Sequence, residues 1–195
     1  MAWQPPVIGS RPVAVLGAGV LGRRIACSFV SGGYNVFIRD PSAEARQAAI
    51  QYIDENKQQY TKHLPASVGT VKPGSYAASE DMATAVSEAW LVIEAVPEKI
   101  ELKIDTFAEL GRLTPADCIL GSNSSSFKSS LMLDKVTSKQ RRSQICNIHY
   151  TMPPDVRTVE LMTDGETEPA IFPFLSGILE KCGMLPATAR KESTG

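Results

Sequence analysis

The sequence predicts an α/β protein whose doubly wound, mainly parallel sheet is covered by helices on both faces. Short apolar runs alternate with longer stretches of helical periodicity, a pattern typical of strand–helix–strand units. The first such run closes on glycines at Gly17, Gly19 and Gly22, and the next ends at Asp40. A glycine triplet alone is a weak signal. Here it lies between a strand and a helix, and the next strand ends in an acidic residue, which makes the signal strong.

Glycines and one serine divide the first part of the chain. A strand at residues 12–16 leads into a helix that the Gly-Gly pair at 32–33 ends as a C-cap. A second strand is expected at residues 35–39. Ser42 is a natural N-cap for the long helix that follows and continues to Tyr60.

The middle of the chain begins with a segment rich in Gly, Pro and Ser at residues 64–79. We expect a loop there, with short strands inside it as the alternative, and Ser79 as the cap of a brief helix at residues 82–86. A central strand is expected at residues 91–96. Pro97 suits the first turn of the next helix. The apolar residues at helical spacing in that helix, expected to be core, are Ile100, Ile104, Phe107 and Leu110.

The last part continues the alternation. We expect a strand at residues 118–121, a serine-rich turn, a short helix near residues 130–136 and a strand at residues 145–149. The final elements are expected to be a strand at 157–162, a helix at 169–182 and a strand at 185–189.

Composition indicates one globular domain spanning residues 1–195, with residues 1–10 as a flexible N-terminal segment. The formal net charge of −1 and the scattered basic residues favour neither nucleic acid nor a membrane as partner. The four cysteines are far apart and predict reduced, buried thiols; no metal site is expected. Without a signal-peptide pattern or a bilayer-length apolar run, a cytoplasmic location is expected, with an imported organelle as the alternative.

The glycine pattern predicts a dinucleotide-binding turn of the Rossmann type. Gly17 permits the tight turn, Gly19 lets the backbone approach a pyrophosphate, and Gly22 lets the helix pack closely on the strand. Asp40 stands where a carboxylate accepts hydrogen bonds from the adenosine ribose, which favours NAD over NADP. The alternative is a capping aspartate before a proline, and Arg39 beside it could accommodate a 2′-phosphate.

Polar residues follow each apolar run at the edge where a parallel sheet binds ligands. They are the glycine turn, Asp40, Glu98, the turn at 122–126 and His149. A histidine can take a hydroxyl proton during alcohol oxidation, and Glu160 on the following strand could orient its ring. A satisfied strand-end histidine and a solvated glutamate are the equally weighted alternative. His63 is expected to be a surface residue.

The turn Ser122-Asn-Ser-Ser-Ser126 offers hydroxyls to a substrate oxygen or to the nicotinamide amide. The alternative is ordinary turn chemistry, because serines are common in turns. No Gly-x-Ser-x-Gly elbow accompanies this turn, so no serine nucleophile is proposed.

Taken in order, these motifs resemble the N-terminal domain of 3-hydroxyacyl-CoA dehydrogenases. They are the glycine turn, the segments Glu94-Ala-Val-Pro-Glu98 and Ser122–Ser126, Lys103, and His149 through Glu160. The lambda-crystallin/L-gulonate dehydrogenase-like branch is the most similar in character. The resemblance implies an NAD-dependent oxidoreductase of fatty acid or related metabolism that acts on a 3-hydroxyacyl-CoA or a 3-hydroxy acid.

The same resemblance implies the roles of individual residues. His149 would be the general base, Glu160 its partner, and Ser125 a hydrogen-bond partner of the substrate 3-hydroxyl. Glu98 and Lys103 would lie near the cofactor. The expected cofactor-binding residues are Gly17, Gly19, Val20, Leu21, Gly22, Asp40, Ala95, Val96, Glu98, Lys103, Asn123 and Ser125.

Two departures from the family pattern leave other functions open. Met152 stands where the family usually has asparagine, which bears on the acyl-CoA substrate. The helical C-terminal domain of the family, with its part of the substrate pocket and its dimer interface, has no counterpart in these 195 residues. The alternatives are a dinucleotide-binding module without complete dehydrogenase activity, completed by a homodimer or a partner chain, and a core recruited to other small-molecule chemistry.

Overall fold

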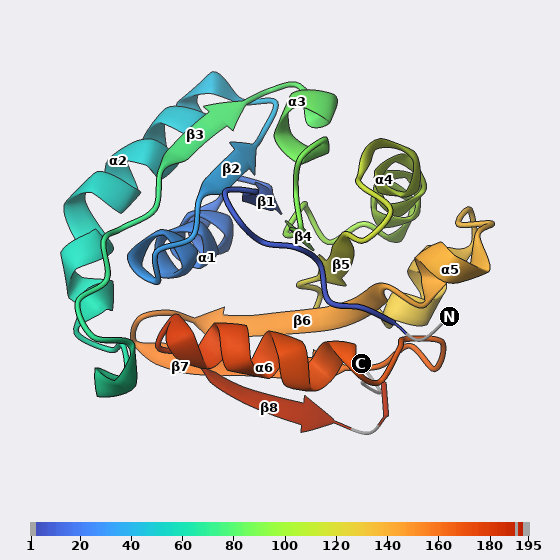
Figure 1. Cartoon of the computed structure of the whole chain (residues 1–195). Helices are drawn as coiled ribbons and strands as arrows, with labels where there is room; N and C mark the ends of the chain where they lie inside the picture. Colours follow the sequence, from blue (N-terminus) through green and yellow to red (C-terminus); the bar gives the residue numbers. More distant parts are fainter. Residues whose placement is uncertain (1–2, 190, 193–195) are drawn as a thin grey trace.

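The computed structural model describes residues 3–189 and 191–192, and they form one eight-stranded sheet (Figure 1). The spatial order is β3-β2-β1-β4-β5-β6-β7-β8. The strands are β1 Val13–Leu16, β2 Val36–Arg39, β3 Tyr76–Ser79, β4 Leu91–Glu94, β5 Ile119–Ser122, β6 Ile145–Met152, β7 Val156–Met162 and β8 Leu185–Ala189. Every neighbouring pair is parallel except β6–β7, which confirms the doubly wound, mainly parallel fold.

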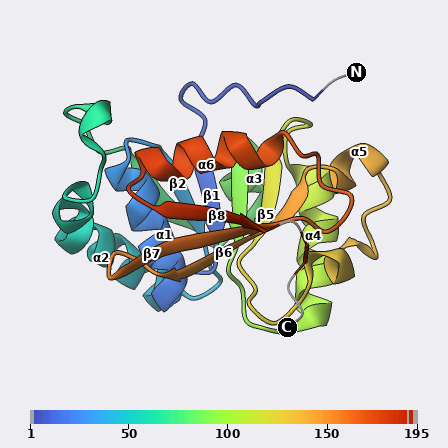
Figure 2. The same cartoon turned by 90° about the horizontal axis from the view of Figure 1, so that it is seen from below.

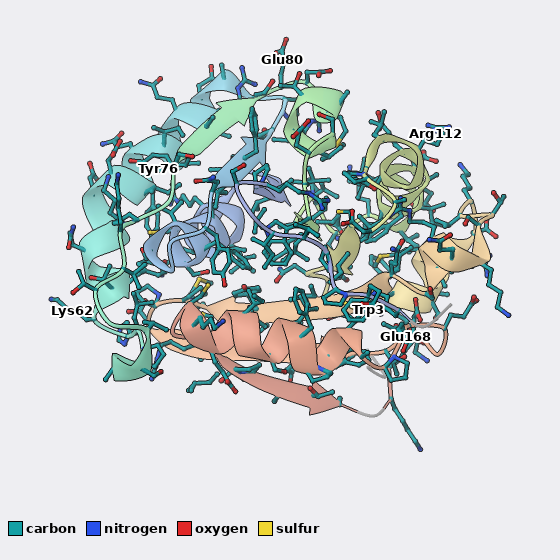
Figure 3. All side chains as sticks on the ribbon, in the orientation of Figure 1. Trp3, Lys62, Tyr76, Glu80, Arg112 and Glu168 are labelled. Carbon is teal, nitrogen blue, oxygen red and sulfur yellow. The ribbon has the colours of Figure 1, made fainter. Side chains whose placement is uncertain are left out.

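Helices cover both faces of this sheet. The α-helices are α1 Val20–Ser31, α2 Ala43–Thr61, α3 Met82–Val86, α4 Ile100–Leu113, α5 Lys139–Arg142 and α6 Ile171–Lys181, and two 3-10 turns are η1 Ala66–Val68 and η2 Ser129–Leu133. Seen from below, α1 and α2 lie at one end of the sheet and α4 and α5 at the other (Figure 2). Charged side chains such as Lys62, Glu80 and Arg112 point outward (Figure 3).

The alternation of side chains along β1 divides the core in two. Val13 and Val15 pack in one apolar cluster with residues of α1, α2 and α6, whereas Ala14 and Leu16 pack in a second cluster with residues of α3, α4 and η2. All four residues are fully buried, as expected for a central strand covered on both faces.

The cysteines lie within these layers. All four are free and buried, as the sequence predicted, and burial raises the pKa of the Cys27 and Cys118 thiols to about 12. A thiol with so high a pKa is a poor nucleophile at neutral pH.

Three local expectations are wrong at the ends of elements. Ser79 is the last residue of β3, and Asp81 caps α3 instead, because its carboxylate accepts the backbone N–H of Thr84 at 2.7 Å. Pro97 precedes α4 rather than entering its first turn, since the helix starts at Ile100. The central strand stops at Glu94, because its side chain accepts the N–H of Val96 and turns the chain there.

The second half departs from the sequence prediction in two further places. The short helix expected near residues 130–136 is the 3-10 turn η2, and α5 was not predicted. The strand expected to end at His149 continues to Met152 and forms a hairpin with β7.

The N-terminal segment lies against α6 and the loops that precede β4 and β5. The ring of Trp3 packs edge-on against Phe174 with centroids 5.9 Å apart, and Arg11 pairs with Asp117 at 2.7 Å. The expected flexibility of residues 1–10 stays a prediction, and residues 1–2 lie outside the described part of the chain. Within that described part, no helix has both the length and the apolar character needed to cross a bilayer.

Candidate active site

The glycine turn between β1 and α1 is closed on its inner side and open on its outer side. Gly17 has a φ of +100°, and a Cβ there would lie 2.4 Å from the carbonyl oxygen of Ala95. A Cβ on Gly22 would lie 1.8 Å from the Gly17 carbonyl oxygen, whereas one on Gly19 would meet no atom within 4 Å. The turn therefore packs against the backbone beyond β4 and leaves space over Gly19.

The start of α1 is suited to an anionic group. Gly19 is the N-cap and provides no side-chain cap, and the first turn contains no acidic residue. The free N–H groups and the dipole of a helix N-terminus favour negative charge there. Together with the space over Gly19, these features match the pyrophosphate of a dinucleotide.

Asp40 connects the end of β2 to the glycine turn. Its Oδ2 accepts the backbone N–H of Ala18 at 2.8 Å, and its Oδ1 accepts that of Ser42 at 2.9 Å. Ser42 itself is the N-cap of α2, as predicted, because its Oγ accepts the N–H of Ala45. Neighbouring Arg39 donates from Nε to the carbonyl oxygen of Glu80 at 2.9 Å.

A buried charged cluster lies where β4 and β5 end. Glu94 is fully buried, Lys103 is 1% exposed, and the Lys103 Nζ lies 2.7 Å from Glu94 Oε1. The Ser122 hydroxyl donates to Glu94 Oε2 at 2.8 Å. Buried charges of this kind persist only when their partners satisfy them.

Glu98 extends this cluster toward solvent. Its Oε2 lies 3.1 Å from Lys103 Nζ, and the Ser124 hydroxyl donates to its other oxygen. Burial opposes ionisation of Glu98, but the hydrogen bonds from Ser124 and Lys103 prevail and hold its pKa below the ordinary value. The structure thus brings the predicted residues Glu98 and Lys103 into contact.

Two asparagines tie the serine turn to β6. The Oδ1 of Asn123 accepts the backbone N–H of Tyr150 at 2.8 Å, and the Nδ2 of Asn147 donates to the carbonyl oxygen of Ser124 at 2.8 Å. The sequence pattern indicates the segments that contain Glu94, Ser122 and Ser124 but gives these residues no individual role, and it does not point to Asn147. Glu94, Ser122 and Ser124 lie at or just beyond strand ends, whereas Asn147 lies within β6.

His149 and Glu160 face each other across the antiparallel pair β6–β7. They are register partners, and Nδ1 of His149 lies 3.0 Å from Oε2 of Glu160. The His149 side chain is 23% exposed and the Glu160 side chain 50% exposed. The hairpin therefore places a carboxylate on one ring nitrogen and leaves the Nε2 side for another partner.

Ser125 is the exception among the predicted residues of this edge. It is exposed, and its only hydrogen-bond contact in the described part of the chain is the Ser126 hydroxyl at 3.5 Å. The structure does not join it to His149. Met152, at the end of β6, is 40% exposed.

Two cavities lie away from the predicted site residues. A cavity of about 460 Å³ beside α4 and η2 and one of about 920 Å³ beside Trp3 and α5 are lined by none of the predicted site residues. Among the described residues, no group of three or more His, Cys, Asp and Glu is arranged to hold a metal ion. The predicted site residues of the described chain therefore gather in the glycine turn, the buried cluster at the ends of β4 and β5, and the His149–Glu160 pair.

Comparison with known proteins gives one family. The model of the 3-hydroxyacyl-CoA dehydrogenase NAD-binding domain matches residues 12–193. The L-carnitine dehydrogenase of Mesorhizobium japonicum is 29% identical over 184 residues, which cover 92% of this chain and 48% of that protein. The lambda-crystallin homolog of Mus musculus is 32% identical over 194 residues, which cover 94% of this chain and 58% of that protein.

A solved structure extends the likeness to three dimensions. A diketoreductase, described as acting on dicarbonyl compounds, matches with a TM-score of 0.82 and 31% identity, over 97% of this chain and 67% of that one. The chain spans about half the length of the curated relatives it matches.

Proposed function

The chain belongs to the 3-hydroxyacyl-CoA dehydrogenase family through its NAD-binding domain, and from this premise we propose that it is an NAD-dependent oxidoreductase. The reaction would move a hydride between nicotinamide and C3 of a 3-hydroxyacyl-CoA or a related 3-hydroxy acid. We take residues 1–195 as one NAD-binding domain. The observation that carries the proposal is the pairing of His149 with Glu160 at 3.0 Å.

The cofactor would be held by the turn between β1 and α1 and by Asp40. Gly17, Gly19 and Gly22 provide the close approach and the space, Val20 and Leu21 begin the helix, and Asp40 would accept the ribose hydroxyls. The other proposed contacts are Ala95, Val96, Glu98, Lys103, Asn123 and Ser125. When bound, NAD supplies the acceptor for the hydride.

His149 would remove the proton of the substrate hydroxyl. In the tautomer whose Nδ1–H donates to Glu160, the Nε2 lone pair is free to accept that proton. The Glu160 carboxylate would then stabilise the imidazolium and keep the ring oriented. Ser125, exposed on its turn, would donate a hydrogen bond to the substrate oxygen.

Met152 at the end of β6 bears on the substrate class. It is an exposed thioether on the same strand as His149, whereas the family pattern has a polar amide at this position. The relatives include an L-carnitine dehydrogenase and a diketoreductase described with dicarbonyl compounds. Small 3-hydroxy acids are therefore proposed alongside 3-hydroxyacyl-CoA thioesters.

NADH absorbance tests this proposal directly. The protein would be incubated with NAD and, in turn, 3-hydroxybutyryl-CoA, L-gulonate, L-carnitine and related hydroxy acids. We expect NADH to form with at least one of them. Calorimetric binding of NAD without turnover on any of these compounds would contradict it.

A second candidate function is dinucleotide binding without complete dehydrogenase activity. The matching family model is that of an NAD-binding domain, so the alternative proposal is a dinucleotide-binding module whose substrate pocket is completed by a second copy or a partner chain. Gel filtration with and without NAD tests this candidate. A monomer that turns over substrate by itself would contradict it.

A further inference from the structure

Glu94 is the most deeply buried charged residue at the candidate site and has no role in the proposed reaction. It is 0% exposed, so neither a substrate nor a cofactor can reach its carboxylate in this conformation. Three donors satisfy it: the N–H of Val96 at 2.9 Å, Nζ of Lys103 at 2.7 Å and the hydroxyl of Ser122 at 2.8 Å. A fully buried carboxylate is costly and needs such compensation.

The three donors come from three different segments. Val96 belongs to the loop after β4, Lys103 to α4, and Ser122 to the end of β5. The carbonyl oxygen of Glu94 also accepts the N–H of Asn123 at 2.8 Å. One residue therefore connects the loop after β4, the buried Lys103 of α4 and the serine turn.

The serine turn depends on this connection. The Ser122 hydroxyl that donates to Glu94 also accepts the backbone N–H of Ser124 at 3.2 Å. The Ser124 hydroxyl then accepts the N–H of Phe127 at 2.9 Å. Because the Ser122 hydroxyl donates its proton to the Glu94 carboxylate, a lone pair of the same oxygen is directed at the N–H of Ser124. Two hydrogen bonds that share one hydroxyl in this way strengthen each other.

We propose that Glu94 is a positioning residue of the dehydrogenase site. Its carboxylate holds Lys103 beside Val96 and Glu98, and through Ser122 it holds the turn at 122–126 in the conformation that presents Ser125. This inference rests on the proposed function, because it assigns the ordered turn to a reaction. Glu94 touches no reacting atom and acts only through its partners.

Two variants separate its contacts. Glu94→Gln keeps the size of the side chain, removes the charge opposite Lys103 and places an amide donor against the Ser122 hydroxyl. Ser122→Ala leaves the Glu94–Lys103 pair intact and removes only the connection to the turn. Thr114→Val is the matched control, because the buried Thr114 hydroxyl donates to Leu110 at 2.7 Å at the far end of α4.

The first measurement is hydrogen–deuterium exchange of the peptide spanning 122–127 in the protein without NAD. We expect exchange at least about tenfold faster in Glu94→Gln and in Ser122→Ala, since each breaks a hydrogen bond to a charged group. The second is the Kd of NAD by calorimetry, expected to rise about tenfold in Glu94→Gln. Thr114→Val should lower the melting temperature and leave both quantities unchanged.

Wild-type exchange and wild-type NAD affinity in a folded Glu94→Gln protein would overturn the proposal. If that variant does not fold, Ser122→Ala decides: unchanged exchange in its 122–127 peptide overturns the proposal, and faster exchange supports it. A failure of the proposed function has a different signature. The wild-type protein would then turn over no hydroxy acid, whatever the exchange data show for the turn.

Discussion

The two nitrogens of the His149 ring have different environments. Nδ1 contacts Glu160, whereas Nε2 is the proposed acceptor of the substrate proton. His149→Ala should therefore lower kcat by about 10²–10⁴-fold, the usual contribution of a general base. The Kd of NAD, measured by calorimetry, should stay nearly unchanged, because the glycine turn and Asp40 follow other strands, β1 and β2.

The only other histidine is the natural control for this experiment. His63 follows α2 and has no part in the proposed chemistry, so His63→Ala should keep wild-type kcat. Equal turnover in wild type and His149→Ala would remove the imidazole from the mechanism.

Asp164 is a second residue with a testable electrostatic property. Its Oδ1 accepts two backbone N–H groups, but its buried Oδ2 has no partner among the described residues. Burial raises the pKa of Asp164 above its ordinary value of 3.8, against the effect of its hydrogen bonds. Such a group stabilises the fold below its unfolded pKa, and that stabilisation is lost as the pH rises through the folded pKa.

Asp164→Asn imitates the protonated carboxyl and should remove this loss. We expect the variant to be more stable than wild type at pH 7, with a difference that shrinks as the pH falls toward about 4. Urea denaturation at both pH values measures it. If the variant is less stable than wild type by the same amount at both pH values, the charge of Asp164 does not affect stability.

At the scale of elements, the sequence predicts those helices and strands whose signals lie within one short segment of the chain. The apolar runs of β1, β4 and β5 and the N-cap Ser42 are properties of a few consecutive residues, and all were predicted. The composition of residues 64–79 predicts a loop with a strand only as the alternative, and β3 lies at the end of this segment. This strand is short, at least partly exposed along its length, and exists because β2 pairs with it.

The same distinction explains the candidate site. Glycine spacing and strand ends gave the residues of the cofactor turn, and Asp40 does lie against it. The contact of Glu94 with Ser122 joins residues on two strands that pair side by side, so no local pattern contains it. The absence of a hydrogen bond between Ser125 and His149 among the described residues likewise depends on how the turn is held.

The glycine turn yields a prediction that separates folding from binding. Gly22→Ala would place a Cβ 1.8 Å from the Gly17 carbonyl oxygen, and it should destabilise the fold by about 1–3 kcal/mol or more. The Cβ of Gly19→Ala would meet open space, and the extended backbone there, with φ −63° and ψ −172°, suits alanine, so the change should cost about 1 kcal/mol or less. Its Cβ would instead cover the proposed pyrophosphate site and raise the Kd of NAD at least about tenfold.

Urea denaturation and calorimetry on the two variants measure these effects. Gly19→Ala with unchanged NAD affinity would contradict the assignment of this turn to the pyrophosphate. A Gly22→Ala protein as stable as wild type would show instead that α1 can move away from the turn.

For the whole molecule, binding and stability are linked, because a ligand that binds only the folded state stabilises it. NAD at about a hundred times its Kd should add about 2.7 kcal/mol to the free energy of unfolding. For a chain of this size that corresponds to a rise in melting temperature of roughly 5–10 °C. Differential scanning calorimetry measures the shift.

The same scan compares NADP with NAD. The Asp40 carboxylate lies against the N–H of Ala18 and would repel a 2′-phosphate, so NADP at equal concentration should raise the melting temperature far less. Two nearby guanidiniums oppose this preference for NAD, because their positive charge attracts a 2′-phosphate. Arg39 contacts the Glu80 carbonyl, and Arg46 donates to the Asp40 carbonyl at 2.7 Å. Equal shifts from both cofactors would mean that these arginines prevail. Asp40→Asn removes the repelling charge while keeping an acceptor oxygen, so it should narrow the difference between the two shifts mainly by increasing that of NADP.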